Sequence, residues 1–200
     1  MTLTYWAMID TYSTSMTIAD FYQYGSPDGA SYNGHANGSP ATQNGLSQVF
    51  FVDASDGLSM AVVHDSAHDG SGGRAITSWS LSNDTAGFVV RDDPGESYST
   101  SGGGTSFATS QLWVSCCTDG FAIGSLENNW EMIGSHTLNS VTFGITDWQA
   151  TSADGNDITL ALVSGLNVRF DTVQPASAPA TLALIGLGLL GLTRLSRKVV

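Results

Sequence analysis

Two histidines lie four residues apart in the segment His64-Asp65-Ser66-Ala67-His68. On a helix, that spacing would place both imidazole rings on one face, where they could share a metal ion such as zinc. The segment, however, follows an apolar run typical of a strand and leads into Gly70-Ser71-Gly72-Gly73, which disfavours a helix. We therefore expect a solvated turn at this place in the chain.

Three acidic turns could supply oxygen ligands to a cation: Asp53–Gly57, Asp92–Glu96 and Asp154–Asp157. Ca²⁺ takes carboxylate and carbonyl oxygens from loops of this kind, but none of the three matches the twelve-residue EF-hand loop. Asp and Asn are also common in turns because they hydrogen-bond to their own backbone. We expect plain turns, with Ca²⁺ binding as the alternative, and we assign no metal or cofactor.

The two cysteines, Cys116 and Cys117, are adjacent. Neighbouring residues can close only a small strained ring, so we expect two thiols packed at a strand end, with a rare vicinal disulfide as the alternative. One such pair provides neither a disulfide framework nor the spacing of a zinc site.

Two further groups of residues could act on a ligand. The indoles of Trp79, Trp113, Trp130 and Trp148 could form a platform on which sugar rings stack, although Trp residues more often lie in a core. Two carboxylates facing each other across a groove would suit a hydrolase of extracellular polysaccharide, but the sequence does not show which of the 18 acidic residues would pair.

The segment Gly104-Thr105-Ser106 resembles the segment around the nucleophile of subtilisin-like proteases. A serine becomes a nucleophile only with a general base and an orienting carboxylate in place. The Asp and His segments of that family are not recognisable upstream, and the helical patterns of its α/β fold are absent. We expect no catalytic residues.

The elements that position these residues are short strands. Val49–Val52 and Leu58–Val63, joined through Ser55-Asp56-Gly57, predict a hairpin. Apolar and polar residues alternate with period two in Val141–Ile145 and Ile158–Leu162, as in antiparallel sheets with one buried face. Other predicted strands are Ala75–Leu81, Gly87–Arg91, Gln111–Ser115, Phe121–Gly124 and Leu166–Phe170, and the predicted loops are 25–45 and 99–105. The pattern predicts an all-β fold, an antiparallel two-sheet sandwich or jelly roll.

Acidic residues dominate the chain, with 18 Asp and Glu against 6 Lys and Arg. Three of the six cations, Arg194, Arg197 and Lys198, lie at the C-terminus. The remainder is too acidic to bind phosphate backbones or anionic lipid headgroups, which argues against nucleic acid as a partner. Neutral glycans, divalent cations and other proteins remain as partners.

The C-terminal segment Ala180–Thr193 holds fourteen uncharged residues, mostly Leu, Ile, Gly and Ala, followed by the three cations. A helix of that length covers roughly 21 Å, short of the ~30 Å hydrocarbon core unless its neutral flank from Val173 contributes. We expect a single short transmembrane helix at 180–193, a linker at 173–179 and a basic cytoplasmic tail at 194–200. The β-rich domain, 1–172, then faces the other side of the membrane.

This order of parts resembles the PEP-CTERM sorting signal of Gram-negative bacteria, a Pro-Glu-Pro motif followed by a Leu- and Gly-rich helix and a basic end. Pro179, Ala180, Thr181 and Leu182 match the second proline and the start of the helix, and Arg194, Arg197 and Lys198 match the basic end. Ser177 and Ala178 stand where the motif has its first proline and its glutamate. The resemblance implies retention in the inner membrane and processing by an exosortase.

Destination and function follow from this resemblance as expectations. After processing, such proteins reach the cell surface or an extracellular matrix, so we expect an exported, non-catalytic surface or matrix protein. A carbohydrate-binding module acting on exopolysaccharide is the alternative. Residues 1–15 lack Lys and Arg and make a poor signal peptide, so we expect the export signal to lie upstream of Met1.

Overall fold

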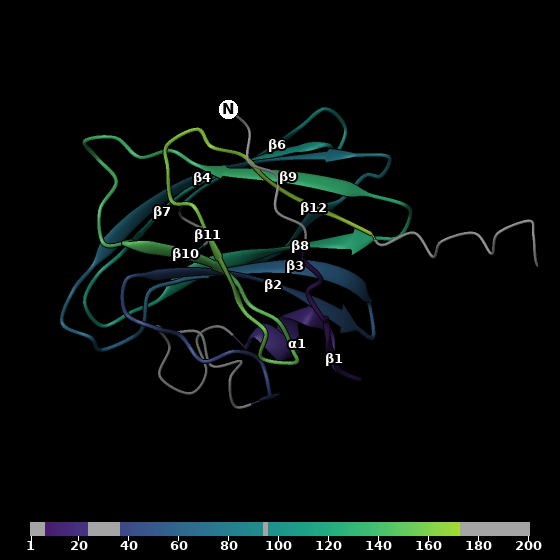
Figure 1. Ribbon diagram of the computed structural model, residues 1–200, viewed down its shortest axis with the longest axis horizontal. Coiled ribbons are helices and arrows are strands. Elements are labelled where there is room, and N and C mark those ends of the chain that lie inside the picture. The colour runs from purple at the N-terminus through teal and green to yellow at the C-terminus, as the bar shows by residue number, and fades with distance from the viewer. Residues whose placement is uncertain (1–6, 24–36, 94–95, 173–200) are drawn as a thin grey trace, which may run out of the picture.

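The computed structural model describes residues 7–23, 37–93 and 96–172, which form two β-sheets packed face to face (Figure 1). The seven-stranded sheet has the order β11-β10-β2-β3-β8-β5, with β1 paired to β2. The five-stranded sheet has the order β12-β9-β4-β7-β6. The predicted all-β, two-sheet sandwich is therefore confirmed.

The described strands and the helix follow one another along the chain with these bounds: β1 Tyr12–Ser13, α1 Ile18–Tyr22, β2 Leu46–Ala54, β3 Gly57–His64, β4 Gly73–Ser82, β5 Gly87–Arg91, β6 Ser97–Ser101, β7 Ser106–Trp113, β8 Asp119–Leu126, β9 Glu131–His136, β10 Asp147–Ala150, β11 Ile158–Leu160 and β12 Val168–Asp171. The predicted hairpin is β2 and β3, and β5 has the predicted bounds. The predicted long loop at 25–45 falls mostly outside the described residues.

The five-stranded sheet buries one face and exposes the other. In β4, Ala75, Thr77, Trp79 and Leu81 are buried, and the serines between the last three of them are exposed. The inward residues meet those of the seven-stranded sheet in a core that includes three tryptophans, Trp79, Trp130 and Trp148. The alternation in the sequence therefore corresponds to an apolar inner face and a polar outer face.

The seven-stranded sheet is covered on its outer face by α1 (Figure 1). Ile18, Phe21 and Tyr22 of the helix are buried against Phe50, Val52, Ala61 and Val63 of β2 and β3 in a second core cluster. Strands buried on both faces need apolar residues at successive positions. This explains why Val49–Val52 and Ala61–Val63 read as continuous apolar runs.

Several strand predictions are wrong in detail. Val141–Ile145 forms no strand, because Phe143 makes only an isolated bridge to Arg74 and the chain turns before β10. The predicted loop at 99–105 contains the end of β6, and β9 and β10 were not predicted. Strand β10 pairs with β2 in parallel, as β1 does, so the sheet is not purely antiparallel.

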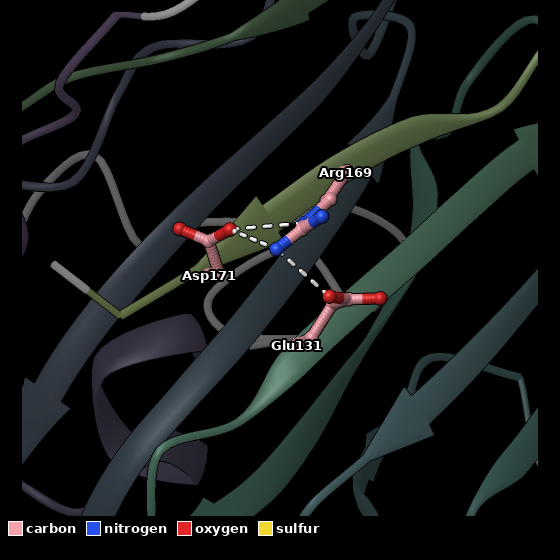
Figure 2. Close-up of polar contacts among 3 residues, drawn as sticks. All are labelled: Glu131, Arg169 and Asp171. Carbon is pink, nitrogen blue, oxygen red and sulfur yellow. Dashed lines mark hydrogen bonds and ion pairs between the residues drawn. The ribbon is translucent and has the colours of Figure 1, made fainter. Parts of the chain in front are cut away.

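The last strand, β12, is joined to β9 by charge as well as by backbone hydrogen bonds. Figure 2 shows the Arg169 guanidinium between two carboxylates, with Nη2 2.9 Å from Glu131 Oε2 and 2.9 Å from Asp171 Oδ2. The Arg169 side chain is half-exposed, so these pairs contribute less than about 1 kcal/mol each. The one guanidinium offsets the charge of one of the two carboxylates at the edge of the sheet where the described chain ends.

The predicted linker, spanning helix and basic tail, residues 173–200, lie outside the described residues. Among the residues that are described, no helix is both long enough and apolar enough to cross a membrane.

Candidate functional site

The histidines predicted to lie in a turn are separated by the fold. His64 is the last residue of β3 and is fully buried, whereas His68 is exposed in the turn that follows. Within the described ranges, no three His, Cys, Asp or Glu side chains are grouped so that they could hold a metal ion. The expectation of a solvated turn is thus correct for His68 and wrong for His64.

His64 belongs to a buried polar cluster between the two sheets. Its Nδ1 lies 2.9 Å from Ser47 Oγ, which lies 3.1 Å from His136 Nε2, and its Nε2 lies 3.1 Å from Gln111 Oε1. The registers of β2, β3 and β8 place Ser47, His64 and Asp119 side by side, and Gln111 reaches across from β7. The cluster connects the two sheets at one end of the sandwich.

The pKa values of both histidines are far below the ordinary value of 6.5. Burial, together with the nearby charge of His136, lowers the pKa of His64 to about 3. Burial lowers the pKa of His136 to about 4. Both rings are neutral at pH 7. Ser47 is within reach of two bases, but it is completely buried, so no reactant reaches its hydroxyl group.

Three carboxyl groups meet at the outer end of this cluster. Asp119 Oδ1 accepts hydrogen bonds from Gln111 Nε2 at 3.0 Å and from Gly120 N at 2.8 Å, and Asp92 Oδ2 accepts one from Tyr22 Oη at 2.9 Å. Glu96 Oε1 accepts from Leu112 N. The other oxygen of each carboxyl group is buried and has no hydrogen-bond partner among the described residues.

Burial of these acids close to one another raises their pKa values. Burial and the charge of Asp119 raise the pKa of Glu96 to about 8. Burial raises the pKa of Asp119 to about 6, although the hydrogen bonds from Gln111 and Gly120 oppose the rise. Burial and the charge of Asp119 raise the pKa of Asp92 well above its ordinary value. Glu96 therefore holds a proton at neutral pH.

The acidic turns cap the backbone. Asp56 Oδ1 accepts from Ile18 N at 2.9 Å at the start of α1, and Asp157 Oδ1 accepts from Ser152 N at 2.9 Å. Asp154 Oδ1 accepts from Asn156 N at 3.0 Å. These bonds confirm the turn interpretation for residues 53–57 and 154–157. In the third predicted turn, residues 92–96, the carboxyl groups of Asp92 and Glu96 instead enter the buried cluster.

All four tryptophans proposed for a sugar-stacking platform are buried. The exposed fraction is 2% for Trp79, 4% for Trp113, 5% for Trp130 and 1% for Trp148. Their rings pack against other rings, as Trp79 does against Phe121 and Trp148 at centroid distances of 6.4 and 6.3 Å. The burial confirms that these tryptophans belong to the core, as expected, and removes the alternative of a stacking platform built from them.

Ser106, the residue that resembles a protease nucleophile, begins β7. Its cross-strand neighbours are Ser80 in β4 and Ser101 in β6, so neither neighbour is a general base. The three serines belong instead to the outer face of the five-stranded sheet, where they line a shallow groove of about 400 Å³ together with Ser78, Ser99, Ser135, Ile133 and Asn167. None of the described residues that line this groove carries a carboxylate.

At the other end of the same outer face the surface is apolar. Leu112 lies opposite Arg74 in the β4–β7 register, and Phe143 lies on the other side of Arg74 through its bridge. Val114 and Val141 follow in the adjoining loops. The exposed fractions are 54% for Leu112, 63% for Val114, 45% for Val141 and 55% for Phe143. We call Leu112, Val114, Val141 and Phe143 the apolar patch.

The cysteines form a vicinal disulfide in the turn after β7, the alternative of the two expected states. The turn is held by hydrogen bonds from Cys117 N to Val114 O at 2.9 Å and from His68 N to Cys116 O at 3.2 Å. Both cysteines are half-buried.

We expect the double substitution Cys116→Ser and Cys117→Ser to lower the free energy of unfolding by about 1 kcal/mol or less, because a cross-link between neighbours restricts the unfolded chain very little. Urea unfolding of the two proteins measures the difference. Alkylation of the urea-unfolded wild type should label both cysteines only after reduction; labelling of both without a reductant would show that the disulfide is absent.

The chain matches no protein-family model, no curated protein and no solved structure.

Proposed function

We propose that this chain is an exported, non-catalytic protein of the cell surface or extracellular matrix, presented by a C-terminal membrane-anchoring and sorting segment. The observation that carries the proposal is the order of parts after the sandwich. Fourteen uncharged residues, Ala180–Thr193, precede Arg194, Arg197 and Lys198 at the end of an otherwise acidic chain. An apolar helix that has cations at only one of its two ends takes a defined orientation in a membrane.

The fold supports this proposal because the sandwich has its own core. The described residues bury two apolar clusters, one between the sheets and one beneath α1. A domain with a core of its own can be presented by a separate anchoring segment. Domain 1–172 lies outside, 173–179 links it to the spanning helix 180–193, and 194–200 stays in the cytoplasm.

The proposed partners are the inner membrane and a processing enzyme of the exosortase type. Pro179, Ala180, Thr181 and Leu182 form the part of the chain that such an enzyme would read. Ser47, His64 and His136 are close enough to exchange a proton, but all three are buried in the core. Their burial supports a non-catalytic function. The carbohydrate-binding alternative loses its supporting observation, because the four indoles are buried.

Cell fractionation tests the proposal. The full chain, expressed behind an export signal, should remain with the membrane, and a variant ending at Thr172 should be released in soluble form. Substitution of Arg194, Arg197 and Lys198 by Ala should weaken retention and randomise the orientation, because the cations hold the tail in the cytoplasm. Protease protection reports the orientation, and intact mass reports cleavage near Pro179.

Two controls make the result decisive. Ser80→Ala, on the exposed face of β4, should fractionate as the wild type does. Circular dichroism of the released variant should show the same β-sheet signal as the full chain. Equal retention of the full and shortened chains would remove the anchoring function, whereas retention without cleavage would remove only the processing step.

A further inference from the structure

Among the described residues, no helix covers the outer face of the five-stranded sheet. Helix α1 lies over the seven-stranded sheet, on the far side of the molecule from this face (Figure 1). The exposed serines of β4 and β6 lie on the outer face of the five-stranded sheet, and Leu112 and Phe143 of the apolar patch flank Arg74 on it. A contiguous exposed apolar surface on a soluble domain marks a place of contact with another molecule.

The strand register places two members of the apolar patch, Leu112 and Phe143, on either side of Arg74. Arg74 N donates to Phe143 O at 2.8 Å, Phe143 N donates to Arg74 O at 3.2 Å, and Leu112 pairs with Arg74 from the opposite side. The Arg74 guanidinium donates to Ser110 Oγ at 3.0 Å on the same face. The patch thus consists of exposed apolar side chains on both sides of one cation.

Charges of opposite sign balance on the described strands of this face. By the alternation of β9 and β12, Glu131 and Asp171 point outward, and both contact Arg169 at the end of the face away from the patch (Figure 2). Arg169 offsets one of these two negative charges, and Arg74 beside the patch offsets the other. The whole chain has a net charge of −12. Two copies would repel each other through most of their surfaces, but least where these two balanced faces meet.

We propose that the apolar patch is the contact surface for a second copy of this chain. A two-fold axis places the same patch on both sides of an interface, so the patch must complement itself. Exposed apolar side chains can pack against the same side chains of a second copy, whereas two acidic surfaces repel each other. A neutral polysaccharide fits less well, because the patch contains a single aromatic ring, that of Phe143, on which a sugar could stack. The proposal stands independently of the membrane anchor.

Sedimentation equilibrium of the full chain in a mild detergent tests the proposal. We expect a concentration-dependent dimer that strengthens as the ionic strength rises from about 0.01 to about 0.15 M, because the Debye length falls from about 30 to about 8 Å and screens the repulsion between the two acidic copies. The double variant Leu112→Ser and Phe143→Ser should dimerise at least about 30-fold more weakly. Val114→Asp should also weaken the dimer, since it places a negative charge on both contacting faces.

Val89→Ser is the matched control. Val89 is 41% exposed on β5 of the other sheet, so this variant should dimerise as the wild type does. All variants carry the same C-terminal segment, so association through that segment affects them equally. A wild type that stays monomeric up to about 1 mM overturns the proposal. So does a dimer that the patch variants leave unchanged while their thermal unfolding shows an intact fold.

Discussion

Replacing Trp79 by Ala should lower the free energy of unfolding by about 3–5 kcal/mol, which is the usual cost of removing a large buried ring. Trp79 is 2% exposed, and its ring lies between side chains of both sheets, with Phe121 and Trp148 on one side and Phe170 of β12 at 6.5 Å. Its indole Nε1 donates to Thr77 Oγ1 at 2.9 Å. The substitution would therefore leave a cavity in the centre of the sandwich and remove one buried hydrogen bond. Urea unfolding measures the loss.

Two further substitutions at and beside this position serve as controls. Trp79→Phe keeps an aromatic ring but loses the hydrogen bond to Thr77, so it should cost less than Trp79→Ala. Ser80→Ala lies one residue further along β4 on the exposed face and should change the free energy of unfolding by no more than about 0.5 kcal/mol. If Trp79→Ala cost no more than Ser80→Ala, the packing of the two sheets around Trp79 would be wrong.

The carboxyl cluster should make the protein less stable as the pH rises from 7 to 9. In the folded protein Glu96 has a pKa of about 8, above the ordinary value of 4.5, so it binds a proton that the unfolded chain has already released. A raised carboxyl pKa gives stability at low pH that is lost as the pH passes through the folded value. The expected loss between pH 7 and 9 is about 1 kcal/mol or less, because the two states differ by a proton only up to about pH 8 and because solvent screens half-buried Glu96. Urea unfolding at each pH measures it.

The two buried histidines, His64 and His136, do not change the stability of the protein between pH 7 and 9. Their lowered pKa values give stability that is lost as the pH falls below 6.5, so above pH 7 they are largely neutral in both states. Glu96→Gln should remove most of the decline, because the amide of glutamine neither binds nor releases a proton between pH 7 and 9. Exposed Glu127→Gln should leave the decline as it is in the wild type. A wild-type stability that rises between pH 7 and 9 would contradict the protonated state of Glu96.

The strands that could be predicted from sequence are those whose apolar residues do all the packing. The hairpin of β2 and β3 is apparent because β-branched and aromatic residues flank a turn ending at Gly57, whose φ of 110° suits glycine. Strand β9 is hidden for the opposite reason. Its inward position Gly134 carries no side chain, because the ring of Trp79 occupies the space, and a Cβ atom there would lie 2.1 Å from Trp79 Cζ3.

Other elements carry too little local signal. Strand β6 is mostly serine and threonine, so only its hydrogen bonds with β7 distinguish it from the loop that was predicted there. Helix α1 has five residues, which is too short to show helical periodicity. It begins at the Thr17 cap, whose hydroxyl group accepts from Asp20 N at 3.2 Å, and it is buried only because β2 and β3 provide an apolar outer face.

By itself, the sequence determined the all-β class and the acidic character of the domain, because alternation and charge are properties of local composition. It also contains the apolar segment 180–193 and its terminal cations, on which the proposed destination depends. Only the tertiary structure decided that the tryptophans are buried, that Ser47 meets His64 and His136, and that burial beside Asp119 raises the pKa of Glu96. These contacts join residues far apart in the chain, and they arise only when two sheets close on each other and exclude water from the groups between them.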